Sequence, residues 1–395
     1  MINKKMYDLG VKPSDIRTLF EYGKTRKQEI GEDKVYDFSL GNPNVPAPEI
    51  VNKTLTDLIN NTAPEVLHGY TSAVGDNNVR TAIANYLNNK YNISLDEKLI
   101  YMTAGAAASL TISLNAILNE GNEVIVLAPF FPEYRVFIEK ANGKVVVVNS
   151  DLKTFKPNLN NLKNAINSNT KAIIINYPNN PTGVVLNDEE LTSLTNLLKE
   201  KQKEFNTAIY LISDEPYREL VYGDIETPFV TKYYDNTIVC YSFSKSLSLP
   251  GERIGYILVS PNCIYSKELF YAICGAGRSL GYVCAPALFQ YMIPNCLGVT
   301  SNLNIYKENR ELLYSALTSF GYEVVKPEGA FYIFMKALGN SSYEFCEKAK
   351  QYELLLVPSD SFGCTGYVRI SYCVSPKTVK NSLDSFKKLI ESYKE

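Results

Sequence analysis

The chain has 395 residues, of which 45% are hydrophobic, and its formal net charge is −2 at pH 7. This length allows two domains with sizeable cores, and the small net charge gives no electrostatic basis for binding nucleic acid or an anionic membrane surface. No apolar run approaches the ~18 residues that span a bilayer, so we expect no membrane segment.

The numbers of histidines and cysteines argue against further kinds of functional site. One histidine, His68, is too few for a histidine-based metal site and makes a Ser-His-Asp hydrolase a poor hypothesis. The eight cysteines are scattered without a Cys-x-x-Cys pair, which argues against a zinc site or a disulfide framework. The first residues, Met1–Asp8, lack the apolar core of a signal peptide. We therefore expect a cytoplasmic protein with reduced thiols.

The first 35 residues are mainly polar and contain one amphipathic segment, Ser14–Tyr22. Ser14 can cap a helix in which Ile16 and other apolar residues share one face. A short strand and a Gly/Pro-rich loop follow over residues 37–46. We interpret Gly41 in this loop either as part of a plain connection or as a point of close backbone approach to a ligand.

A predicted helix over residues 48–60 precedes Tyr70, which by itself indicates only a structural residue because the chain has 29 tyrosines. The strand Leu99–Thr103 then leads into the small residues Ala104–Ser109, which open a helix lasting to about Leu118. Free backbone N–H groups and the helix dipole at such a start form an anion site without side chains. Close packing of the helix start on the strand is the alternative.

Short apolar segments rich in β-branched residues predict the next strands. They cover residues 123–129, 144–148, 171–176, 208–213, 237–241 and 254–259. Helical segments separate most of them, which predicts an α/β fold with a largely parallel sheet covered on both faces.

Polar and aromatic residues follow several of these strands, at the sheet edge where open α/β sheets bind ligands. Phe131 follows the first of the strands just named, and Asn180 lies in an Asn-Asn-Pro-Thr-Gly turn after the third. Asp214 ends the fourth and is followed by Tyr217. A carboxylate among apolar neighbours needs a partner, so Asp214 is either a ligand-binding residue or a helix N-cap.

The central motif is Ser-Phe-Ser-Lys-Ser at 242–246, between two predicted strands, with Arg253 shortly after it. Burial and a neighbouring cation lower the pKa of a lysine and make Lys245 nucleophilic. Arg253 and the serines can hold a phosphate. A Schiff-base lysine in a polar loop beside a phosphate cradle is the pattern of an enzyme that holds pyridoxal phosphate. The alternative is a solvated loop lysine with a surface arginine.

The C-terminal part begins with a long polar helix from about Pro294 and continues as an α+β unit. Arg369 lies in the predicted strand Tyr367–Tyr372, and a buried arginine requires a carboxylate, either from a ligand or from a structural salt bridge. The glycine spacing around Arg278 does not fit a dinucleotide-binding motif.

These motifs together resemble the class I/II aminotransferases, the aspartate-aminotransferase-like enzymes of pyridoxal phosphate fold type I. The resemblance runs from about Phe38 to Tyr372 and is strongest at 242–256 and at the turn 179–183. It implies a large domain with a mostly parallel seven-stranded sheet between helices, plus a smaller α+β domain. We expect residues 1–47 to form an N-terminal arm and part of the small domain, 48–290 the large cofactor-binding domain, and 291–395 the small domain.

The resemblance also implies site residues and the cofactor pyridoxal 5'-phosphate. The implied cofactor-binding residues are Tyr70, Gly105, Ala106, Ala107, Phe131, Asn180, Asp214, Tyr217, Ser242, Ser244, Lys245 and Arg253. The implied substrate-binding residues are Gly41, Asn180, Arg278 and Arg369, and the implied catalytic residues are Lys245, Asp214 and Tyr217. Ala106 and Ala107 replace hydroxyl or amide residues of many relatives, which leaves backbone donors there. Because the chain has no tryptophan, Phe131 stacks on the cofactor ring.

In this family the tyrosine at the position of Tyr70 reaches the cofactor phosphate of the neighbouring subunit, which implies a homodimer with shared active sites. In dicarboxylate-specific relatives an arginine near Arg278 binds the distal carboxylate across the same interface. A surface role for Arg278 is the alternative.

The implied reaction is transamination between an amino acid and a 2-oxo acid through a Schiff base on Lys245. β-Elimination by a C–S lyase, or decarboxylation, is the alternative on the same scaffold, because a fold does not fix a reaction. A non-catalytic sensor domain and a relative without cofactor are further alternatives, although no basic helix-turn-helix segment supports the former.

Overall fold

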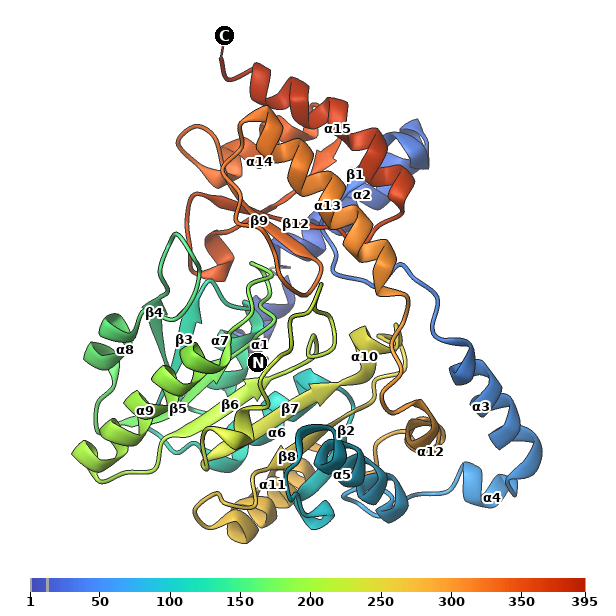
Figure 1. Cartoon of the computed structure of the whole chain (residues 1–395), viewed down its shortest axis with the longest axis vertical. Helices are drawn as coiled ribbons and strands as arrows, with labels where there is room; N and C mark the ends of the chain where they lie inside the picture. Colours follow the sequence, from blue (N-terminus) through green and yellow to red (C-terminus); the bar gives the residue numbers. More distant parts are fainter. Residues whose placement is uncertain (1, 12–13, 395) are drawn as a thin grey trace.

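The computed structural model describes residues 2–11 and 14–394 and has two parts, a large α/β sheet structure and a smaller α+β unit (Figure 1). The seven-stranded sheet has the order β2-β8-β7-β6-β5-β3-β4. Its strands are β2 (Ile100–Thr103), β3 (Glu123–Ala128), β4 (Lys144–Asn149), β5 (Thr170–Ile175), β6 (Tyr210–Asp214), β7 (Thr237–Ser242) and β8 (Gly255–Val259).

All strands of this sheet are parallel except β8, which runs antiparallel to both of its neighbours. The predicted α/β fold with a mostly parallel seven-stranded sheet is confirmed. Side chains alternate between the two faces, as in β3, where Val124 and Val126 pack into one core and Ile125 and Leu127 into another. Helices cover both faces, so the central strands are buried along their whole length.

Most helices of the large part cover the two faces of the sheet, while α3 (Glu49–Asn61) and α4 (Pro64–Leu67) lie to one side of it (Figure 1). The other helices of this part are α5 (Asn77–Tyr91), α6 (Ala106–Ile117), α7 (Glu133–Lys140), α8 (Leu159–Ala165), α9 (Asp188–Phe205), α10 (Phe243–Ser246), α11 (Ser266–Leu280) and α12 (Ala287–Cys296). Short 3₁₀ turns lie at Glu32–Lys34, Glu97–Leu99, Val230–Lys232 and Asp360–Phe362.

The smaller unit has an antiparallel sheet of order β11-β12-β9 and a parallel pair, β1 with β10. Its strands are β1 (Tyr36–Asp37), β9 (Tyr332–Lys336), β10 (Leu354–Leu355), β11 (Val357–Pro358) and β12 (Tyr367–Ser371), and its C-terminal helices are α13 (Leu303–Phe320), α14 (Ser342–Lys350) and α15 (Pro376–Glu391). Phe38 packs into the same core as Phe331 and Phe386, so the chain after β1 belongs to this unit. The domain boundaries at 47 and 290 stay a prediction.

Two helices precede the first strand, α1 (Lys4–Val11) and α2 (Asp15–Ile30). Ser14 caps α2 as predicted and accepts a hydrogen bond from the Arg17 backbone N–H at 3.4 Å. The helix continues beyond Tyr22 because its later turns are fixed to the smaller unit by the ion pairs Arg26–Glu353 and Lys27–Asp37. Within residues 2–11 and 14–394, no helix is both long enough and apolar enough to cross a bilayer.

Candidate active site

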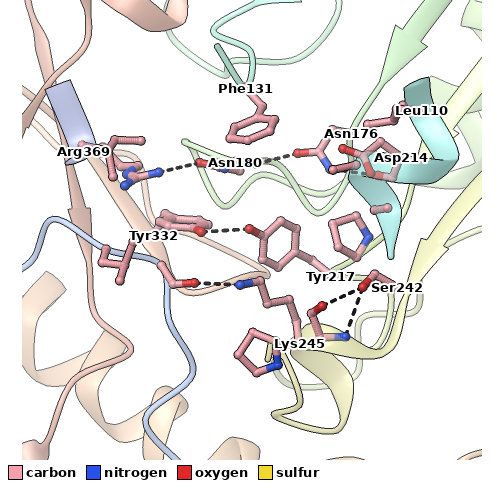
Figure 2. Close-up of a pocket in the computed structure, with 18 of the residues that line it drawn as sticks. Leu110, Phe131, Asn176, Asn180, Asp214, Tyr217, Ser242, Lys245, Tyr332 and Arg369 are labelled. Carbon is pink, nitrogen blue, oxygen red and sulfur yellow. Dashed lines mark hydrogen bonds between the residues drawn. The ribbon is translucent and has the colours of Figure 1, made fainter. Parts of the chain in front are cut away.

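A pocket of about 260 Å³ lies at the carboxyl ends of the central strands, facing the smaller unit (Figure 2). This is the edge at which open α/β sheets bind ligands. The pocket is lined by Ile16, Leu40, Gly41, Ala106, Ala107, Leu110, Phe131, Asn176, Asn180, Asp214, Pro216, Tyr217, Ser242, Ser244, Lys245, Pro250, Arg253, Tyr332 and Arg369.

Lys245 points into this pocket from the short helix α10, directly after β7 (Figure 2). The prediction of a loop at this position was wrong, because Ser242 caps a helical turn by accepting a hydrogen bond from the Ser244 N–H at 3.2 Å. The Lys245 ammonium donates to the Gly41 carbonyl at 2.7 Å. Burial lowers the pKa of Lys245 to about 8, with a smaller contribution in the same direction from the charge of Arg253.

The N-terminus of α6 and Arg253 form one end of the pocket. Gly105 precedes the helix with φ +88°, and a Cβ at this position would lie only 2.8 Å from Arg253 Nη2. Ala106 and Ala107 start the helix and line the pocket, so the unpaired N–H groups of its first turn are not covered by large side chains. An arginine facing a bare helix start is a site for a phosphate or similar anion.

The serines of the central motif lie beside this end of the pocket. The Ser242 and Ser244 hydroxyls are 2.7 Å apart, and Arg253 Nη1 donates to Ser244 Oγ at 3.5 Å and to the Pro250 carbonyl at 3.0 Å. These contacts hold the guanidinium beside the helix start and leave hydroxyl groups close to it. The anion site thus combines an arginine, two hydroxyls and backbone amides.

Asp214 ends β6 and is fully buried, and no helix of the described chain begins after it for the side chain to cap. Its Oδ2 accepts a hydrogen bond from the Tyr134 hydroxyl at 2.5 Å, while Oδ1 has no partner among the described residues. The Asn176 side chain donates to the Asp214 backbone carbonyl at 2.8 Å. Burial raises the pKa of Asp214 to about 7. A carboxylate held this way requires a further donor, which a ligand can supply.

Arg369 lies in β12 at the other end of the pocket and is 2% exposed. Its Nη1 donates to Asn180 Oδ1 at 3.2 Å and its Nη2 to the Ser39 carbonyl at 2.5 Å, while Nε has no partner in the described chain. No described carboxylate pairs with it, so the alternative of a structural salt bridge is not supported. Burial lowers the pKa of Arg369, which indicates a charge that lacks its counterion.

Aromatic groups fill the space between the two ends of the pocket (Figure 2). The hydroxyls of Tyr217 and Tyr332 are 2.8 Å apart, and the ring of Phe131 meets that of Tyr134 edge-on at 5.7 Å between centroids. A Cβ at Gly41 would overlap the Tyr332 hydroxyl, so glycine is required here by packing within the protein, and the approach of its backbone to a ligand stays a prediction.

Two predicted site residues lie away from this pocket. Tyr70 is 97% exposed, and Arg278 is exposed in the last turn of α11. Neither lines the pocket of its own chain. Their predicted roles require a second subunit, and they stay predictions.

Several residues that line or support the pocket were not singled out from the sequence, namely Tyr134, Asn176, Leu40 and, as a pocket residue, Ile16. Asn176 ends a predicted strand, and Tyr134 follows Phe131 by three residues, so a sequence pattern marked both positions. Leu40 and Ile16 come from the smaller unit and the N-terminal segment, and the packing of the parts of the molecule brings them here.

The fold and the pocket define a class of protein: an α/β enzyme with a buried amine beside an anion site, suited to Schiff-base chemistry on a phosphorylated cofactor. The chain belongs to the aminotransferase class I and II family, whose model matches residues 33–386.

Relatives and solved structures agree with this assignment. The chain is 32% identical to the aspartate aminotransferase of Thermotoga maritima over 368 residues, covering 92% of this chain and 93% of that protein. It is 32% identical to a probable N-acetyl-LL-diaminopimelate aminotransferase of Bacillus subtilis over 363 residues, covering 89% of this chain and 88% of that protein. The chain also matches the crystal structure of an aminotransferase from Eubacterium rectale. The match covers 100% of both chains, with 52% sequence identity and a TM-score of 0.98.

The protein is therefore an aminotransferase, and the reaction of its family is pyridoxal phosphate-dependent transamination. Membership of the family implies pyridoxal 5'-phosphate as cofactor and amino acids and 2-oxo acids as substrates.

Proposed function

We propose that the pocket binds pyridoxal 5'-phosphate covalently at Lys245 Nζ and transfers amino groups between an amino acid and a 2-oxo acid. The observation that carries the proposal is the position of Lys245, a buried amine with a pKa of about 8 that lines the same pocket as the anion site at Gly105 and the carboxylate of Asp214, whose Oδ1 is unpaired. A phosphorylated pyridine aldehyde matches this set of groups, since it carries an anion, a carbonyl and a ring nitrogen.

We assign the cofactor to residues that line the pocket. Arg253, the serine hydroxyls and the first N–H groups of α6 would bind the phosphate, and Phe131 would pack on the ring. Asp214 would bind the ring nitrogen, and the pocket residues Tyr217 and Asn180 would donate to the phenolic oxygen. When bound, pyridoxal phosphate supplies an electron sink for a negative charge at the substrate Cα.

The residues around Arg369 would hold the substrate. Arg369 binds the α-carboxylate with its planar guanidinium, and Asn180, already in contact with Nη1, assists it. As a free amine, Lys245 would act as the general base that takes the proton from the substrate Cα, and would then deliver it to the carbon on the other side of the substrate nitrogen. Because burial lowers the pKa of Lys245 to about 8, a useful fraction of this amine is neutral near pH 8.

We further propose that the protein works as a homodimer with shared active sites. The 97% exposure of Tyr70 supports this, since in isolation the chain leaves a large aromatic ring uncovered. Arg278, also exposed, remains a candidate for binding a distal carboxylate in the neighbouring subunit. We propose a cytoplasmic location because all eight cysteines are free, as is usual for proteins in a reducing compartment.

Borohydride reduction of the holoenzyme followed by peptide mapping tests the covalent step. We expect the label on the peptide that contains Lys245, and we expect Lys245→Ala to lose both the absorbance band of the linkage and transamination. Lys171→Ala is the matched control, because burial also lowers the pKa of Lys171 but it lies outside the pocket. A label on another lysine, or a Lys245→Ala variant that keeps activity, contradicts the proposal.

An assay with a panel of amino donors and 2-oxoglutarate, pyruvate and oxaloacetate as acceptors identifies the substrates. If Arg278 binds a distal carboxylate, Arg278→Ala lowers kcat/KM for aspartate and glutamate more than for alanine. An equal effect on all three donors excludes that role.

A further inference from the structure

We assigned Tyr134 no contact with the cofactor or the substrate, but it contacts Asp214, which is proposed to bind the cofactor. It lies in the first turn of α7, is 1% exposed, and its hydroxyl donates to Asp214 Oδ2 at 2.5 Å. Oδ1 has no partner among the described residues. One oxygen of the carboxylate is thus fixed by the protein, and the other is left for a ligand.

The direction of this hydrogen bond follows from the surroundings of both groups. Burial raises the pKa of Tyr134 well above its ordinary value, and the negative charge of Asp214 acts in the same direction. The phenol therefore keeps its proton and is the donor. Burial raises the pKa of Asp214, while the hydrogen bond from Tyr134 acts against that shift. Tyr134 thus favours the ionised carboxylate at a place that otherwise disfavours it.

The other groups that face Asp214 do not replace this donor. Glu215 is a second carboxylate and raises the pKa of Asp214, although its own charge is neutralised by an ion pair with Arg218. Cys240 on the neighbouring strand β7 is kept a neutral thiol by burial, which raises its pKa. Tyr217 bonds to Tyr332 instead. The side-chain hydrogen bond to the carboxylate comes from Tyr134 alone within the described chain.

We propose that Tyr134 is a positioning residue for the cofactor: by donating to Oδ2 it fixes the orientation of the Asp214 carboxylate and keeps it negatively charged for the ring nitrogen. This inference rests on the proposed function, since it needs pyridoxal phosphate in the pocket. Tyr134 acts through Asp214 and does not itself touch the reacting atoms.

The test is the affinity of the apoprotein for pyridoxal phosphate as a function of pH, measured by equilibrium dialysis. Because protonated Asp214 no longer attracts the pyridinium, affinity falls as the pH drops through the titration of this carboxylate. In Tyr134→Phe we expect the midpoint of that fall to move up by about one pH unit, which is about a fivefold weaker affinity at pH 7 and about tenfold at pH values well below the midpoint.

Two comparisons separate this role from a loss of packing. Tyr234→Phe is the matched control, because Tyr234 is also buried and its hydroxyl donates to the Ile209 carbonyl at 2.7 Å, away from the pocket. It should leave the midpoint unchanged. In an Asp214→Asn background, Tyr134→Phe should cause no further shift, since the titrating group is gone.

The outcomes are distinct. A folded Tyr134→Phe variant with the wild-type midpoint overturns the inference, as does an equal shift in the Asp214→Asn background or in Tyr234→Phe. If wild-type apoprotein binds no pyridoxal phosphate, the proposed function is wrong, and the role inferred for Tyr134 is wrong as well. Thermal unfolding of each variant shows that it is folded under the conditions of the measurement.

Discussion

At the scale of residues, the pocket keeps charged groups in places that disfavour charge. Asp214 is fully buried with one unpaired oxygen, and Arg369 is buried without a carboxylate. Both arrangements lower the stability of the fold, because removing a charge from water is unfavourable unless a partner compensates it. Such groups are expected where a ligand completes the set of partners.

A substitution at Asp214 tests this cost. The unfolded pKa is 3.8 and the folded pKa about 7, so the folded state binds more protons between these values and its stability falls as the pH rises through this window. Asp214→Asn should therefore stabilise the apoprotein, and the gain should grow by about 2.6 kcal/mol between pH 5 and pH 8, at about 1.36 kcal/mol per pKa unit.

Denaturant unfolding of the apoprotein at the two pH values measures this difference. The exposed Asp235 provides the control, since Asp235→Asn should have the same small effect at both pH values. If Asp214→Asn changes the free energy of unfolding equally at pH 5 and pH 8, the buried charge of Asp214 does not destabilise the apoprotein as expected.

The sequence was sufficient to find the residues of the pocket that follow strands, including Lys245, Asp214 and Asn180, because parallel strands end at one edge of a sheet. Contacts between segments that are far apart in the chain could not be predicted from the sequence. The bond from Tyr134 to Asp214 and the contact of Arg369 with Asn180 depend on how α7 and the smaller unit pack, which local patterns do not encode.

At the scale of elements, the strands observed in the large sheet agree with the predicted ones to within one or two residues, because short β-branched segments between turns are distinctive. The antiparallel direction of β8 was not predicted, since a buried strand has the same pattern in either direction. The connection from β7 to β8 carries both Lys245 and Arg253, so one hairpin provides the reactive amine and the guanidinium of the anion site.

The start of α6 gives a prediction at this scale. Gly105→Ala should weaken binding of pyridoxal phosphate at least tenfold, because the added Cβ would lie 2.8 Å from Arg253 Nη2 and displace the guanidinium. Positive φ adds a destabilisation of about 1 kcal/mol or more.

Gly121→Ala is the control for backbone strain alone. Gly121 has nearly the same φ, +87°, but nothing within 4 Å of the added Cβ. Equilibrium dialysis should show a loss of affinity for Gly105→Ala only, while thermal unfolding shows destabilisation for both. Equal affinities of the two variants contradict the assignment of this anion site.

At the scale of the whole molecule, the pocket is lined by residues from two parts with separate cores, and Ile16 of the N-terminal segment also lines it. Lys5 at one end of this segment pairs with Glu139 of α7, while Arg26 in α2 is bound to the smaller unit. The segment thus connects both parts across the pocket.

Shared active sites predict complementation between two defective variants. Lys245→Ala lacks the amine, and Tyr70→Ala lacks the ring proposed to reach the neighbouring site. After subunits of both are mixed and allowed to exchange, half of the dimers are hybrids with one intact site in two, so about a quarter of wild-type activity should return. A mixture no more active than the mean of its two components shows that each chain works alone.

Three cations line the pocket, Lys245, Arg253 and Arg369, whereas Asp214 is the one carboxylate among the described residues that line it. Small oxyanions from the surrounding medium are therefore drawn into the apoprotein. Sulfate or phosphate in a storage buffer screens these charges and stabilises the apo fold by mass action, but it also competes with reconstitution. Exchange into a buffer free of such ions should precede any titration with cofactor.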